Sequence, residues 1–142
     1  MKKEETVDFN IKTTWLAISR MYNQKAQVHG FTMSVGFVLL NINPDLGTRA
    51  TSIAPLVGLE VTSLTRMLKT LEEQGLIERR SDPEDGRAVR IFLTEKGHFG
   101  REIAKGAVIN FNESVKSTVS NEELTVFFKV MKKINETLEK VT

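Results

Sequence analysis

The stretch VTSLTRMLKTLEEQGLIERRSDPEDGRAVRIFLTEKG, residues 61–97, decides the fold of this chain. Its first part predicts a helix over Val61–Gln74, because apolar residues recur at helical spacing along one face. That apolar stripe consists of Val61, Leu64, Met67, Leu68 and Leu71. The opposite face carries Thr62, Arg66, Lys69 and Glu73, flanked by Ser63, Thr65 and Thr70. A face with hydrogen-bond donors and few bulky groups suits the groove of a nucleic acid.

A shorter helix is predicted immediately before this one. The apolar run Ile53–Val57 is followed by Gly58, whose freedom at positive φ suits a tight turn between two crossed helices. Thr48 or Thr51 can cap this helix. Pro55 is then expected near its first turn, where the missing N–H of proline costs least. The order of these two helices predicts a helix-turn-helix.

Two strands are predicted after the helix-turn-helix, at Leu76–Arg80 and Ala88–Leu93. Residues 81–87 connect them and contain Asp-Pro and Asp-Gly, which are turn dipeptides, so we expect an exposed hairpin tip. Arg87 lies at this tip and Arg90 on the stem. A helix-turn-helix followed by such a hairpin is a winged helix.

Composition fits one soluble domain. The chain has 142 residues, 40% hydrophobic and 27% charged, which is enough to bury a substantial core. Its net charge of +2 gives only weak support for a nucleic-acid partner. The absence of cysteine excludes disulfides, thiol nucleophiles and cysteine-based zinc sites. No signal-peptide pattern or long apolar stretch is present, so we expect a cytoplasmic protein, associated with the nucleoid through any DNA binding.

Helices are also predicted on both sides of the winged helix. Thr32 is expected to cap a helix that contains the apolar run Val35–Leu40. The first helix, Val7–Val28, has an apolar face formed by Ile11, Trp15, Ile18 and Tyr22. The helix Gly97–Val119 repeats apolar residues at Phe99, Ile103, Ala107, Phe111 and Val115. The last helix follows a capping box at Ser120–Glu123 and has an apolar seam of Leu124, Phe127, Met131, Ile134, Leu138 and Val141. Such stripes require helical partners, within the chain or in a second chain.

Three motifs carry a resemblance to a known family. They are Leu71–Arg79 (LEEQGLIER), Asp82–Arg87 (DPEDGR) and Leu93–Gly97 (LTEKG). They resemble the end of the recognition helix, the D-x-R wing and the L-T-x-x-G entry to the fifth helix of the MarR (multiple antibiotic resistance regulator) family of bacterial and archaeal transcription factors. Gly30–Thr32 is similar to the family's G-L-T entry to the second helix, whereas Gly36, Pro55 and Gly86 depart from its pattern.

The resemblance implies a mainly α-helical fold with a small β-wing, in which the whole chain is a single MarR-like domain. The winged helix-turn-helix region is then 32–97, with the helix-turn-helix at about 51–75 and the wing at about 76–93. Residues 7–28 and 97–141 become the dimerisation helices of an obligate-type homodimer. The implied function is sequence-specific binding of double-stranded DNA by a transcriptional regulator, a repressor on a pseudo-palindromic operator. Two-fold symmetry would place two recognition helices about one helical turn apart.

Residues expected to contact DNA lie on the polar helix face and on the wing. Those for the major groove are Thr62, Ser63, Thr65, Arg66 and Lys69. Their hydroxyls can meet phosphates or base edges, and arginine can make bidentate contact with guanine. Arg87 is expected in the minor groove, with Arg90 as a further contact from the stem. The resemblance gives Asp85 the role of shaping the wing or holding a nearby arginine.

Acidic residues leave a second hypothesis open, a winged-helix module that binds a protein without specific DNA binding. Asp82, Glu84 and Asp85 would suit such a module. From Val61 to Leu93, six basic and six acidic residues give no net charge, so DNA binding requires the two signs to be separated in space. Salt dependence distinguishes the two hypotheses, because DNA affinity falls steeply as salt rises.

A small aromatic or acidic effector is a further expected partner. Its predicted pocket consists of Trp15, Arg20, Tyr22, His29 and Phe31, an aromatic and cationic set. Trp15 equally suits core or dimer packing, and both interpretations remain open. No metal site, cofactor or enzymatic activity is expected. The two histidines, His29 and His98, lie far apart, and the P-loop, dinucleotide-binding and G-x-S-x-G motifs are missing.

Overall fold

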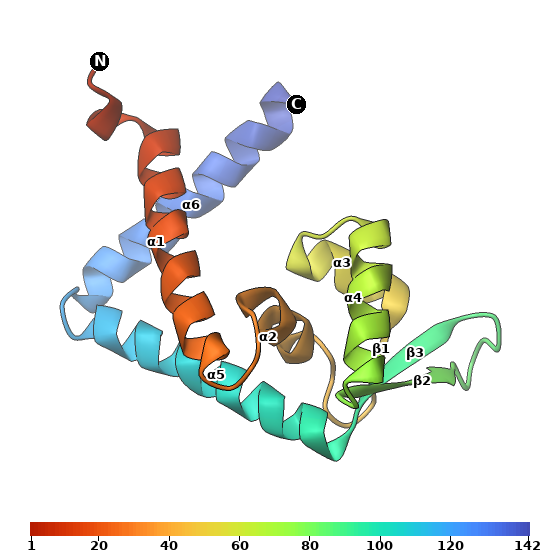
Figure 1. The fold of residues 1–142 in the computed structure, drawn as a ribbon. Helices are drawn as coiled ribbons and strands as arrows, with labels where there is room; N and C mark the ends of the chain where they lie inside the picture. The colour runs from red at the N-terminus through yellow and green to blue at the C-terminus, as the bar shows by residue number, and fades with distance from the viewer. The chain divides into compact units, whose positions relative to one another are not determined.

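The computed structural model describes all 142 residues and contains six α-helices and three strands (Figure 1). In chain order the elements are a 3-10 helix η1 (Lys3–Glu5), α1 (Val7–Gln27), α2 (Met33–Leu40), β1 (Thr48–Arg49), α3 (Ala50–Val57), α4 (Val61–Glu73), β2 (Ile77–Ser81), β3 (Val89–Leu93), α5 (Glu95–Lys116) and α6 (Asn121–Val141). The chain forms two compact units, Met1–Ala107 and Val108–Thr142. None of the helices has the length and apolar character needed to cross a membrane. The predicted mainly α-helical fold with a β-wing is confirmed.

The buried core of the first unit belongs to the winged helix. It consists of Val38, Leu39, Ile42, Ile53, Ala54, Leu64, Leu68, Leu71, Leu76, Ile77, Ile91 and Leu93. These side chains come from helices α2, α3 and α4, from strands β2 and β3, and from the segments that join them. Complete burial of one such aliphatic side chain contributes about 1.5–3 kcal/mol. The winged helix therefore closes a hydrophobic core from its own residues.

Helix α4 buries most of the apolar stripe predicted for it. Leu64, Leu68 and Leu71 are buried, and Met67 packs against the same core. Val61 is an exception, because its side chain is 72% exposed. Side chains on a helix lean toward its N-terminus, so the side chain of the first residue projects beyond the covered part of the helix. Gly58 precedes the helix with φ of 69°, the left-handed conformation predicted for the turn.

The wing is part of a three-stranded antiparallel sheet with the strand order β1-β3-β2. The hairpin predicted from the turn dipeptides is present, and β2 pairs with β3 from Ile77↔Leu93 to Ser81↔Val89. Strand β1 pairs with β3 through Thr48↔Ile91 and was not predicted, since two residues are too few for an alternating pattern.

Strand β1 changes the start of helix α3. Thr48 lies in the strand, and Arg49 occupies the N-cap position without a side-chain cap, so the predicted capping by Thr48 or Thr51 is wrong. The helix starts at Ala50, which puts Pro55 inside the helix rather than near its first turn. The helix is short, as the proline predicted, and ends at Val57.

Helix α5 starts two residues before the predicted Gly97, because Thr94 organises its first turn. The Thr94 hydroxyl accepts a hydrogen bond from the Gly97 N–H at 3.0 Å and donates one to the Gly75 carbonyl at 2.6 Å. A Cβ at Gly97 would overlap the carbonyl oxygen of Leu76, so only glycine permits this close approach. At α2 the predicted cap is confirmed, since the Thr32 hydroxyl accepts from the Val35 N–H at 3.2 Å.

Helix α6 begins at the predicted capping box and leaves its apolar seam only partly covered, with Leu124, Met131 and Ile134 half-buried. The Ser120 hydroxyl accepts from the Glu123 N–H at 3.1 Å, and the Glu123 carboxylate accepts from the Ser120 N–H at 3.0 Å. No residue of this helix is buried. Phe127 and Leu138 of the seam are 53% and 51% exposed. The apolar seam of α6 is therefore not part of a buried core within its own unit.

Candidate nucleic-acid interface

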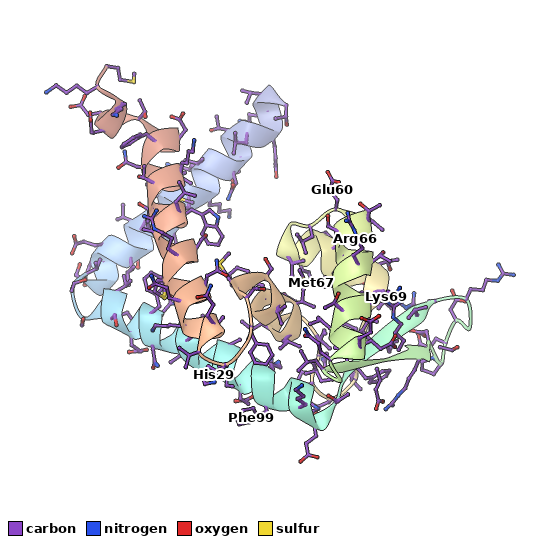
Figure 2. All side chains as sticks on the ribbon, viewed as in Figure 1. His29, Glu60, Arg66, Met67, Lys69 and Phe99 are labelled. Carbon is purple, nitrogen blue, oxygen red and sulfur yellow. The ribbon has the colours of Figure 1, made fainter.

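The polar face of α4 is exposed along its length. Thr62, Thr65, Arg66 and Lys69 are exposed, and Ser63 is half-buried on the flank. Figure 2 shows Arg66 and Lys69 along the helix, with Glu60 at its N-terminal end. Neither Arg66 nor Lys69 forms an ion pair within the chain. Both cations therefore remain available to an anion outside the chain.

The hydroxyl groups of α4 differ in what they can offer a partner. The Thr65 hydroxyl donates to the Val61 carbonyl at 2.8 Å, and the Thr70 hydroxyl donates to the Arg66 carbonyl at 3.1 Å. A hydroxyl that donates inside its own helix has only lone pairs left for a second partner. The hydroxyls of Thr62 and Ser63 make no hydrogen bond in the chain, so they can donate or accept.

Opposing electrostatic effects meet at the start of α4. Glu60 occupies the N-cap position without a side-chain cap, which leaves the first N–H groups of the helix open. Open N–H groups at a helix N-terminus favour a phosphate. The Glu60 carboxylate carries the same sign as a phosphate and opposes it. Any attraction at this end therefore depends on the cations farther along the helix.

The six basic residues between Val61 and Leu93 form two groups. Those that form ion pairs are Arg79 with Glu72 at 3.7 Å, Arg80 with Glu78 at 2.7 Å and Arg90 with Asp82 at 2.9 Å. The others, Arg66, Lys69 and Arg87, have no ion pair. Half of the cations of this segment therefore neutralise acids of the wing and the helix end, while the other half have no ion pair within the chain.

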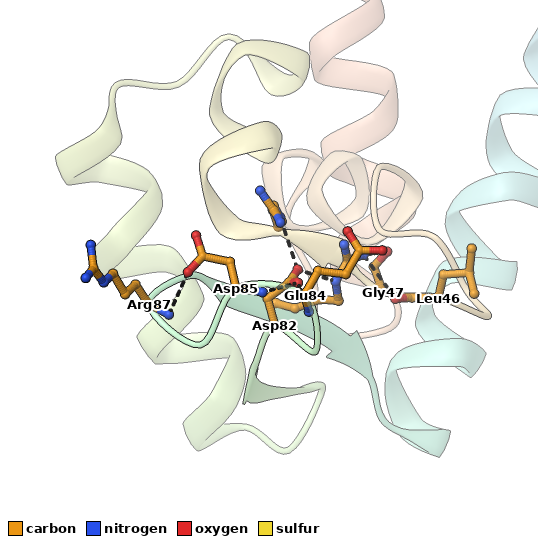
Figure 3. A network of polar contacts seen from close by, with 8 residues as sticks. Leu46, Gly47, Asp82, Glu84, Asp85 and Arg87 are labelled. Carbon is orange, nitrogen blue, oxygen red and sulfur yellow. Dashed lines mark hydrogen bonds and ion pairs between the residues drawn. The ribbon is translucent and has the colours of Figure 1, made fainter.

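Arg87 lies at the tip of the wing with a free guanidinium. Its backbone N–H donates to the Asp85 carboxylate at 3.0 Å, while its side chain makes no hydrogen bond or ion pair. Figure 3 shows this side chain extending away from the polar network around it. The contact of Asp85 with the Arg87 backbone fits the wing-shaping role predicted for this carboxylate. Asp85 does not hold an arginine side chain.

Asp82 is the residue of this region that sequence reasoning missed. It is 2% exposed, and one oxygen, Oδ2, accepts from Arg49 Nε at 3.0 Å and from Arg90 Nε at 2.9 Å. The other oxygen, Oδ1, accepts from the Glu84 N–H at 2.8 Å. The Arg49 hydrogen bond is the largest cause that holds the pKa of this carboxyl well below its usual range. A buried carboxylate needs such partners. The dipeptide Asp82-Pro83 signals a turn but carries no signal for Arg49, which is remote in sequence.

The Nε and Nη1 groups of Arg90 are bound inside the chain. Besides its ion pair with Asp82, its Nη1 donates to the carbonyls of Leu46 and Gly47, each at 3.2 Å. Arg90 is half-buried, in contrast with the exposed Arg87. The DNA contact predicted for Arg90 therefore stays a prediction that this geometry does not favour.

Two of the five predicted effector residues meet at one aromatic ring. Trp15 stacks on Phe37 with ring centroids 6.3 Å apart, and Tyr22 approaches the same ring edge-on at 6.0 Å. Burial raises the pKa of Tyr22. Phe31 instead packs against the winged-helix core.

The remaining two effector residues, Arg20 and His29, are exposed. No group of three or more histidine, aspartate and glutamate side chains is arranged to hold a metal ion.

Comparison with known proteins finds relatives of the winged-helix segment. The sequence model of the MarR family matches residues 31–89, most of the winged helix. A protein of Bacillus subtilis (strain 168), described as the uncharacterized HTH-type transcriptional regulator YdgJ, is 29% identical over 85 residues, or 60% of this chain. The chain spans about half the length of that relative, 52%.

Solved structures share the fold at low sequence identity. The MepR–DNA complex of S. aureus superposes with a TM-score of 0.84 at 21% identity, covering 94% of this chain and 98% of that one. PcaV from Streptomyces coelicolor, solved with its natural ligand, has a TM-score of 0.75 at 17% identity and coverage of 96% of both chains. These similarities establish the fold, and the family match falls on the segment that carries α4 and most of the wing. Residues 31–89 of this chain are therefore similar in sequence to the MarR family.

Proposed function

We propose that this protein is a transcriptional regulator that binds double-stranded DNA sequence-specifically as a homodimer. Three cations of the winged helix that have no ion pair within the chain carry the proposal. Arg66, Lys69 and Arg87 are free of ion pairs, whereas the other basic residues of that segment neutralise acids. The fold shared with MepR, a protein solved in complex with DNA, supports the same interpretation.

In this proposal α4 enters the major groove and the wing reaches the adjacent minor groove. Arg66 is suited to bidentate contact with guanine, and Lys69 to a phosphate. Thr62 and Ser63 can donate or accept at a base edge or a phosphate, while Thr65 can only accept, for example from a base amino group. Arg87 inserts into a narrow A·T-rich minor groove, whose negative potential attracts a free guanidinium.

The proposed homodimer rests on the exposed part of the α6 seam, which consists of Phe127, Leu138 and Val141. Apolar residues at alternating intervals of three and four along a helix favour packing against another helix. A second copy of the chain supplies that helix and also the two-fold symmetry that a pseudo-palindromic operator matches. Repression then follows by occlusion of a promoter, with the protein acting in the cytoplasm.

A small aromatic or acidic effector completes the proposal. The rings of Trp15, Phe37 and Tyr22 form a cluster that can stack with an aromatic molecule, and Trp15 is partly exposed there. PcaV, which shares the fold, was solved with its natural ligand. An effector shifts DNA affinity only as far as it prefers one spacing of the recognition helices over another.

The alternative function, a module that binds a protein partner through the wing acids, loses most of its basis. Asp82 is buried between two arginines, and Asp85 accepts a hydrogen bond from the wing backbone. Glu84 is the one wing acid whose carboxylate makes no hydrogen bond or ion pair. A single free carboxylate is a weak determinant for a protein partner.

Binding to DNA from upstream of its own gene tests the proposal. The purified protein is titrated across salt concentrations, with an unrelated duplex as competitor. We expect selective binding whose affinity falls steeply with salt, since log K changes by roughly −0.9 per phosphate neutralised for each tenfold rise in salt. Weak and unselective binding at low salt would contradict the proposal and direct the search to a protein partner.

A further inference from the structure

One buried carboxylate joins the wing to the helix-turn-helix. We infer that Asp82 is a positioning residue whose ion pairs with Arg49 and Arg90 hold the wing in place relative to the helix-turn-helix, so that Arg87 is presented to DNA. Asp82 itself does not touch DNA. This inference rests on the proposed function and assigns a role to residues outside the contact surface.

We call Asp82 together with its ion pairs to Arg49 and Arg90 the clamp. The ion pair with Arg49 connects the clamp to the helix-turn-helix. Arg49 is the last residue of β1 and the N-cap residue of α3, the first helix of the helix-turn-helix. Its Nε donates to Asp82 Oδ2 at 3.0 Å. Asp82 follows directly after strand β2 at the beginning of the wing turn. The ion pair therefore connects the start of α3 to the base of the wing tip (Figure 3).

The ion pair between Arg90 and Asp82 connects the clamp to the stem of the wing. Arg90 of β3 donates its Nε to the same Asp82 oxygen at 2.9 Å, while its Nη1 bonds the carbonyls of Leu46 and Gly47. A Cβ at Gly47, where φ is +66°, would lie 2.6 Å from the Ile91 carbonyl oxygen. The backbone at Leu46 and Gly47 thus lies directly against β3, and the hydrogen bonds of Arg90 hold this segment to the strand.

The other oxygen of Asp82 connects the clamp to the wing tip. Asp82 Oδ1 accepts from the N–H groups of Glu84 at 2.8 Å and Asp85 at 3.3 Å. The Asp85 carboxylate in turn accepts from the Arg87 N–H at 3.0 Å. A continuous series of hydrogen bonds therefore runs from Arg49 through Asp82 and the wing turn to the backbone of Arg87.

Removal of the Asp82 charge is expected to loosen this series. An asparagine has nearly the same shape, but its amide offers one acceptor oxygen and cannot form two ion pairs. Arg49 and Arg90 would then lose their shared anion. A wing that changes position more freely must be ordered on binding, which lowers affinity. The loss of DNA affinity arises because Arg87 is no longer held in position. Arg87 therefore contributes less to DNA binding once the clamp is broken.

A double-mutant cycle on selective DNA tests this role. Asp82→Asn and Arg87→Ala are each expected to weaken binding by roughly 5- to 150-fold, the range of one specific contact. The affinity of the double variant should lie within about twofold of the affinity of the weaker-binding single variant. Multiplying losses, or wild-type affinity for Asp82→Asn, would overturn the inference.

Glu84→Gln is the matched control, because it removes the same charge from the same turn without breaking a side-chain contact. Loss of a negative charge near a polyanion by itself favours binding. We therefore expect Glu84→Gln to bind as tightly as the wild type or more tightly, and Asp82→Asn to bind more weakly. A parallel loss in both variants would contradict the clamp.

Arg49→Lys provides a second route if Asp82→Asn does not fold, as judged by circular dichroism. Lysine keeps the positive charge but lacks the planar fork that meets a carboxylate. The Arg49 side chain is 38% exposed, so the substitution introduces no large cavity. We expect Arg49→Lys to bind DNA more weakly than the wild type. Its loss of affinity should not add to the loss caused by Arg87→Ala when the two substitutions are combined. Selective, salt-dependent binding by the wild type is required first, and its absence would reject the proposed function rather than the clamp.

Discussion

Helices α4 and α6 have similar amphipathic sequences but opposite environments. Helix α4 buries Leu64, Leu68 and Leu71 and exposes its polar face. Helix α6 fully buries no residue and exposes Phe127, Leu138 and Val141 of its apolar seam. The face that each helix leaves uncovered indicates the chemistry of its partner. A polar face with free cations suits a polyanion, and an apolar seam suits another apolar helix.

The largest effect is expected in the buried face of α4. Leu71→Ala should lower the free energy of unfolding by about 2–5 kcal/mol, because Leu71 is fully buried and leaves a cavity. Denaturant unfolding measures the loss. Val61→Ala on the same helix should change it by less than about 0.5 kcal/mol, since Val61 is exposed. Equal losses would show that the core is not packed as described.

A substitution in the seam of α6 should act on association instead. Phe127→Ala is expected to weaken the homodimer by more than about 1 kcal/mol, a factor of roughly five or more, if this ring lies in the centre of the interface. Sedimentation equilibrium over a range of concentrations measures the change. Lys132→Ala on the same helix is the control and should leave the dimer unchanged. A wild-type chain that stays monomeric at micromolar concentration would break the comparison.

A smaller effect is expected at the first turn of α6. Ser120→Ala removes the hydroxyl that accepts from the Glu123 N–H, and the loss of such a cap costs about 0.5–2 kcal/mol. Thermal unfolding followed by circular dichroism measures it. Ser114→Ala is the matched control, because that hydroxyl lies inside α5 and alanine is the better helix former there. Identical shifts in both variants would exclude a special role for the capping box.

The fold could be predicted from the sequence largely because its signals are local. The stripe of α4, the Gly58 turn, the wing dipeptides and the Ser120 capping box each lie within a few residues of the structure they specify. The predictions that failed depend on remote contacts. The pairing of Thr48 with Ile91 creates β1, and this strand moves the start of α3.

The candidate site could be predicted only in part for the same reason. Helical periodicity predicted the exposed face with Arg66 and Lys69, and the turn motif predicted the exposed Arg87. Which acid binds Arg90 and Arg49 was not predictable, because both are bound by Asp82 through contacts that no local pattern encodes. A buried carboxylate shared by two arginines appears only when the chain is folded.

The comparison of free and paired cations on the wing tests the central claim most directly. The measurement is the salt dependence of binding to selective DNA for Arg87→Ala and for Arg80→Ala. Arg80 is the matched control, since it pairs with Glu78 at 2.7 Å and lies over the Phe92 ring.

Arg87→Ala should weaken binding by about 1–3 kcal/mol and reduce the slope of log K against log salt by roughly 1. Arg80→Ala should leave the slope at its wild-type value. Equal slopes for the two variants, or no change for Arg87→Ala, would contradict the claim that the free cations of the winged helix form the DNA contact.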